Sequence, residues 1–127
     1  MRIAAIVLMA LAGSAAAARP LPQDYSTARA VWKKTMNKPD YQRYGNEFAQ
    51  FSNHFHLDEK GDCYRLAPGP VTLMLVISKP DAGEFAVVER VYADVDNAKA
   101  RCFIKSYTGV PTKAPPFLPL VLQMTMG

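Results

Sequence analysis

The chain has 127 residues, a formal charge of +4 at pH 7, two cysteines and a hydrophobic content of 50%. This length suits one domain and is too short for two. Acidic residues lie between the basic ones along the chain, so the charge indicates a mixed solvated surface, and we expect no nucleic-acid partner.

Residues 1–18 have the pattern of a cleavable secretory signal. Arg2 supplies a positive start, Ile3–Ala12 is an unbroken apolar run, and residues 13–18 are small. The apolar run is shorter than the roughly 20 residues of a transmembrane helix, and no later segment is apolar for longer. We therefore expect a periplasmic or secreted protein without a transmembrane anchor, whose mature chain, residues 19–127, is one domain.

Two helices are predicted at the start of the mature chain. Asp24 suits the N-cap of a helix over about Tyr25–Asn37, and Asp40 suits the cap of a second helix after the break at Pro39. The apolar residues of the first helix share one face: Ala28, Val31, Trp32 and Met36. Those of the second are aromatic: Tyr41, Tyr44, Phe48, Phe51 and Phe55. An aromatic stripe at this spacing is more often core than cofactor site, so we expect it to pack against a sheet.

From Gly61 the hydrophobic period changes to two. Cys63–Leu66 is a candidate short strand, and Val71–Ser78 is a strong one that is apolar on both faces, so we expect both faces to be covered. A turn over residues 79–83 joins it to a returning strand, Glu84–Ala93.

A third helix and a last strand complete the pattern. Asp94 or Asp96 would cap a helix that reaches about Tyr107 and ends at Gly109. A proline-punctuated passage then leads into Leu118–Met126, which alternates with a period of two. The order predicts an α+β fold, in which an N-terminal helical region precedes a small antiparallel sheet with a ββαβ core, with helices on one face.

Cys63 and Cys102 are the two cysteines. In an oxidising compartment, an isolated pair predicts one disulfide, here closing a loop of about 40 residues and contributing roughly 4 kcal/mol. The alternative is a reactive thiol. No C-x-x-C occurs, and the neighbours Asp62 and Tyr64 do little to favour a thiolate at Cys63.

Residues 69–127 resemble the C-terminal domain of TonB-type energy transducers. The resemblance rests on an apolar strand, a glycine turn at residues 81–83, a valine-rich return strand, a D-x-A-x-A helix start at Asp96, and a proline-rich passage into a closing apolar strand. Energy transducers also keep an uncleaved membrane helix and a long proline-rich spacer. We expect neither here, so the resemblance implies a separate binding domain and not energy transduction.

In that family the domain contacts an outer-membrane receptor by accepting an extended peptide beside its last strand, which needs exposed backbone N–H and C=O groups. The resemblance implies that the corresponding surface is Leu118–Met126, with Val121, Gln123 and Thr125 as outward contacts.

His54 and His56 are the candidate metal ligands. Alternate residues share a face in an extended segment, and Asp58 and Glu59 follow closely. The alternative is a helix end that runs into a polar turn, and it is the one we prefer because the H-E-x-x-H spacing is absent. We therefore assign no metal site and expect no cofactor.

No motif marks a catalytic site. The chain lacks G-x-S-x-G, a calcium-binding loop and a phosphate-binding glycine loop, and Ser52 near His54 does not by itself make a triad. We expect no enzyme. The sequence predicts an exported, non-catalytic domain that binds a protein or peptide of the bacterial envelope. The alternative is an inhibitor of an extracytoplasmic hydrolase such as lysozyme, and a third is a metal or small-ligand carrier that uses His54 and His56.

Overall fold

A computed structural model describes residues 20–55, 62–79 and 85–127, with the backbone alone at residues 53–55. The expected signal segment, residues 1–18, lies outside this part of the chain. In the described part of the chain the elements with defined bounds are, in order, α2 (Tyr25–Thr35), α3 (Pro39–Phe55), β1 (Val71–Ser78), β2 (Phe85–Ala93), α5 (Ala98–Tyr107), β3 (Pro111–Lys113) and β4 (Leu120–Met126).

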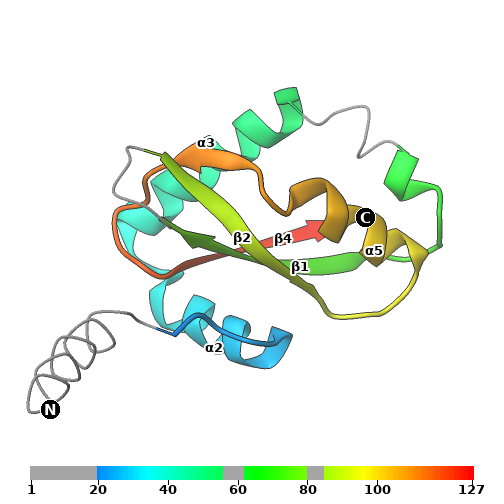
Figure 1. Ribbon diagram of the computed structural model, residues 1–127, viewed down its shortest axis with the longest axis horizontal. Coiled ribbons are helices and arrows are strands. Elements are labelled where there is room, and N and C mark those ends of the chain that lie inside the picture. Colours follow the sequence, from blue (N-terminus) through cyan, green and yellow to red (C-terminus); the bar gives the residue numbers. More distant parts are fainter. Residues whose placement is uncertain (1–19, 56–61, 80–84) are drawn as a thin grey trace, which may run out of the picture.

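The four strands form one antiparallel sheet with the order β3-β2-β1-β4 (Figure 1). β1 is central, and its Leu75 lies opposite Val91 of β2 and Leu122 of β4. β4 is therefore a terminal strand, as β3 is at the other end. This sheet with its helices confirms the predicted α+β class.

Helices cover both faces of the sheet, which corrects the prediction that they lie on one face. α3 and α5 pack on the face that carries Leu73, Leu75 and Ile77, whereas α2 packs on the face that carries Met74 and Val76 (Figure 1). The physical reason is the sequence of β1, whose side chains are apolar on both sides and need two covering layers.

The aromatic face of α3 packs into the core as predicted. Tyr41, Tyr44 and Phe48 are buried in the larger hydrophobic cluster, while Phe51 is 39% exposed. The side chain of Phe55 lies outside the described residues.

Several local predictions were wrong. Asn97, not Asp94 or Asp96, caps α5, and its side chain accepts a hydrogen bond from the Ala100 N–H at 2.8 Å. α3 begins at Pro39, which leaves Asp40 in its first turn. Cys63–Leu66 is a helical turn and not a strand, because the Leu66 N–H donates to the Cys63 carbonyl. The Asp24 cap of α2 is confirmed, since its carboxylate accepts from the Thr27 N–H at 2.8 Å.

The predicted disulfide is present. Cys63 and Cys102 are bonded with an S–S distance of 1.97 Å, and their Cα atoms lie 5.4 Å apart. The bond joins the turn before β1 to the middle of α5, and it is compatible with an oxidising compartment. Among the described residues, no helix combines the length and the apolar character that crossing a membrane requires.

The core contains a buried tyrosine whose ionisation makes stability depend on alkaline pH. Burial raises the pKa of Tyr107 to about 12, although the Ser52 hydroxyl at 2.6 Å from its own hydroxyl opposes this shift. The folded protein therefore keeps a proton that the unfolded chain loses near pH 10. We expect the free energy of unfolding to fall by about 1.4 kcal/mol per pH unit between these values.

Urea unfolding across this pH range measures the slope, with Tyr107→Phe as the matched variant. The variant should show a shallower slope, not a flat one, because burial also raises the pKa values of Tyr41 and Tyr44. An unchanged slope would contradict the assignment to Tyr107.

Candidate functional site

The free edge of β4 presents a defined set of backbone groups. Thr72 of β1 exchanges hydrogen bonds with Asp94, donating its N–H to the carboxylate and accepting from the Asp94 N–H, so its backbone faces β2. Because successive residues of a strand face opposite sides, Leu73 and Leu75 face β4. Their partners Met124 and Leu122 therefore face β1.

The residues between these partners direct their backbone N–H and C=O groups away from the sheet. These are Val121, Gln123 and Thr125, the three residues that the resemblance implies. Their side chains differ in burial: Val121 is fully buried under α2, Gln123 is half-buried, and Thr125 is exposed. The strand register thus aligns the three backbones, but Val121 as a whole residue, backbone included, is 0% exposed, so only Gln123 and Thr125 remain accessible along this edge.

A tyrosine hydroxyl covers the middle of this edge. Burial raises the pKa of Tyr41, and hydrogen bonds from the Gln123 backbone N–H and the Trp32 indole, which would stabilise the phenolate, oppose that shift. Trp32 packs against the hydrophobic clusters on both faces of the sheet. Trp32 of α2 and Tyr41 of α3 therefore protect the centre of β4, a common way to blunt an edge strand.

Tyr44, one turn further along α3, contacts the strand at the other end of the sheet. Its hydroxyl donates to the Lys113 carbonyl at 2.8 Å and lies 3.1 Å from the Thr112 hydroxyl. α3 is thus hydrogen-bonded to both terminal strands. The sequence predicted the packing of this aromatic face, but not that its two tyrosine hydroxyls would reach strand edges.

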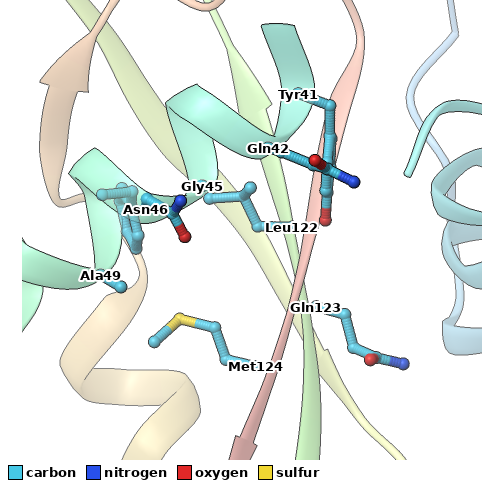
Figure 2. Close-up of a pocket in the computed structure, with 9 residues that line it drawn as sticks. Tyr41, Gln42, Gly45, Asn46, Ala49, Leu122, Gln123 and Met124 are labelled. Carbon is cyan, nitrogen blue, oxygen red and sulfur yellow. The ribbon is translucent and has the colours of Figure 1, made fainter. Parts of the chain in front are cut away.

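A groove of about 440 Å³ lies between α3 and β4 (Figure 2). Leu122 and Met124 point from β4 towards α3, while the side chain of Gln123 points the other way. None of the described residues that line the groove carries a charge at neutral pH. They are Tyr41, Gln42, Gly45, Asn46, Phe48, Ala49, Leu122, Gln123 and Met124. Carboxamides and apolar groups of this kind suit binding.

The other candidate residues lie elsewhere. His54 belongs to α3 with its side chain outside the described residues, and His56, Asp58 and Glu59 lie wholly outside them. Within the described ranges, no group of three or more metal-ligating side chains occurs. Ser52 is completely buried with its hydroxyl 2.6 Å from that of Tyr107, which gives it a structural role.

Comparisons with models of known protein families, with curated proteins and with solved structures found no match. The resemblance to the TonB C-terminal domain therefore stays a prediction from the sequence, and the site is interpreted from its own geometry.

Proposed function

We propose that this chain is an exported, non-catalytic domain that binds an extended protein or peptide segment of the bacterial envelope by adding it beside β4. The observation that carries the proposal is the position of β4 as a terminal strand with an open groove next to it. The backbone groups of Gln123 and Thr125 point away from the sheet there and are accessible, as strand addition requires, whereas Val121 is buried. The TonB-like pattern of residues 69–127 supports the same surface.

Tyr41 is the group that an incoming segment would displace. Its hydroxyl oxygen accepts from the Gln123 N–H, which is the role of a peptide carbonyl in an added strand. Displacement exchanges one neutral hydrogen bond for another, and a net hydrogen bond is worth only about 1 kcal/mol. The edge is therefore protected against chance pairing without being closed to a partner that offers several hydrogen bonds.

The export signal and the disulfide support the location of this function. The apolar run Ile3–Ala12 predicts export, and the bond between Cys63 and Cys102 suits an oxidising compartment. An exported binding domain meets its partners in the envelope, so we expect the bound protein or peptide to be an envelope component.

Gln123→Pro tests the proposal, because proline removes the outward N–H while leaving the pairing between β4 and β1 in place. Residues 19–127 carrying this change should no longer retain envelope proteins that the wild-type chain captures from an envelope extract. Gln123→Ala is the control and should retain them, since it keeps the N–H.

Undiminished capture by a folded Gln123→Pro variant, checked by circular dichroism, would refute strand addition. A lysozyme inhibition assay on the same proteins examines the alternative. Equal inhibition by the wild type and the Gln123→Pro variant would replace the proposal with a hydrolase inhibitor that acts through another surface.

For Tyr41→Phe we expect the opposite effect, which is tighter binding of the partner. The variant frees the Gln123 N–H, so a captured segment no longer competes with the tyrosine hydroxyl. A gain of about 1 kcal/mol corresponds to roughly fivefold tighter binding. Dissociation constants for a captured partner, measured by biolayer interferometry on both chains, check this prediction, and equal constants would show that Tyr41 does not compete.

A further inference from the structure

We infer that the groove between α3 and β4 selects an uncharged segment of the bound peptide, and that Gly45 keeps this groove open. The inference rests on the proposed function, because it concerns the same strand edge. Beyond strand addition itself, it names the kind of side chain that the partner offers to the groove and gives a role to Gly45, whose presence in α3 packing does not explain.

Gly45 lies inside α3, where glycine is a poor choice for helix stability. Its backbone does not require glycine, since only Gly69 and Gly109 have positive φ among the described glycines. A Cβ atom built at Gly45 would lie 3.6 Å from the Leu122 side chain, an ordinary van der Waals distance. Alanine would therefore fit and favour the helix. What alanine would change is the groove, which Gly45 lines.

The chemistry of the lining excludes charge. Every second side chain of an added strand would point to the α3 side of the sheet, the side to which Leu122 and Met124 point (Figure 2). A charged side chain there would lose its hydration without meeting an opposite charge, because the described lining residues carry none. The groove-facing positions of the partner should therefore be uncharged.

The carboxamides of Gln42 and Asn46 add polar contacts from α3. They lie one helical turn apart, both are exposed, and both line the groove. Each offers donors and an acceptor, which suits neutral amide groups as partners.

A peptide fits this site better than a glycan does. The accessible outward backbone groups, those of Gln123 and Thr125, are two residues apart, about 6.8 Å along the strand. An extended peptide has the same spacing and the same pairing of donor with acceptor, whereas sugar hydroxyls do not. We therefore assign the groove to an extended peptide, and a glycan becomes an outcome of the test.

The experiment titrates the isotope-labelled chain, residues 19–127, with a capped nine-residue peptide of alternating serine and valine, and follows backbone amide shifts by NMR. Two further peptides carry lysine or glutamate in place of the central valine. We expect shifts at Gln123 and Thr125 with the uncharged peptide, and at least tenfold weaker binding of both charged peptides.

Gly45→Ala supplies the second readout. It should raise the urea midpoint of unfolding and weaken binding of the uncharged peptide at least fivefold, two effects that a purely structural glycine would not combine. Ser26→Ala is the matched control. It raises the helix propensity at an exposed position of α2 that does not line the groove, so it should leave binding unchanged.

Each outcome decides a separate point. If the uncharged peptide shifts the β4 amides but the charged peptides or Gly45→Ala bind as tightly, the inference fails and strand addition stands. If no peptide shifts these amides, both fail. If chitohexaose shifts the groove amides and the peptides do not, the groove binds a glycan and the inference is overturned.

Discussion

Reduction of the Cys63–Cys102 bond is expected to lower the free energy of unfolding by about 4 kcal/mol, because the bond closes a loop between residues 39 positions apart and removes that much chain entropy from the unfolded state. Small domains have total stabilities of about 5–15 kcal/mol, so this loss is a large part of the whole. Urea unfolding with and without reductant measures it, and mass spectrometry of the same samples verifies that the bond is intact or reduced.

The double variant Cys63→Ala/Cys102→Ala is the control for effects of the reductant itself, and its urea midpoint should not respond to reductant. A reduced wild-type chain whose midpoint equals that of the oxidised chain would show that the loop is already constrained in the unfolded state. With the predicted loss, the fold would be marginal in a reducing cytoplasm, which links its stability to export.

The strands were predictable where their alternation is long. β4 follows from its period of two and β1 from a nearly continuous apolar run, and the apolar character of both faces of β1 correctly predicts that both are covered. The placement of all helices on one face did not follow from any residue pattern and was wrong. Cys63–Leu66 shows the opposite limit, because four residues cannot distinguish a strand from a helical turn.

The α5 cap illustrates why local signals were insufficient. Asp94, Asp96 and Asn97 are all good capping residues within four positions of one another. Asp94 accepts the Thr72 N–H at 2.9 Å, and Asp96 pairs with Arg101 at 2.7 Å, which leaves Asn97 for the helix. Tertiary contacts therefore decided which residue caps the helix.

β3 was missed because it lies in the proline-rich passage. Pro111 belongs to this strand at the end of the sheet, where a residue can lack a backbone N–H without breaking the ladder.

The candidate site was half predictable. The resemblance implied Val121, Gln123 and Thr125 as outward contacts, and the strand register directs their backbone groups away from β1, but Val121 is buried. The covering by Tyr41 was missed, although a signal was present. The aromatic face of α3 begins with two tyrosines, and a buried tyrosine hydroxyl usually finds a hydrogen-bond partner. Which partner it finds depends on how α3 crosses the sheet, and no local pattern contains that information.

Proline at two adjacent positions of β4 should have very different effects on stability. Leu122→Pro removes a buried leucine, a loss of about 2–5 kcal/mol, and leaves the carbonyl of Leu75 without its partner, a further 1–3 kcal/mol. We expect this variant to be largely unfolded. Gln123→Pro loses only the hydrogen bond to Tyr41, about 1 kcal/mol, and should stay folded.

Urea unfolding of both proline variants, and of Leu122→Ala and Gln123→Ala as side-chain controls, measures this contrast. The controls separate the lost side chain from the lost N–H, so the difference between proline and alanine at each position reports the direction of that backbone group. Similar differences at the two positions would mean that Gln123 does not face the free edge. Strand addition at β4 depends on that direction, so the same result would remove the structural basis of the proposed function before any partner is known.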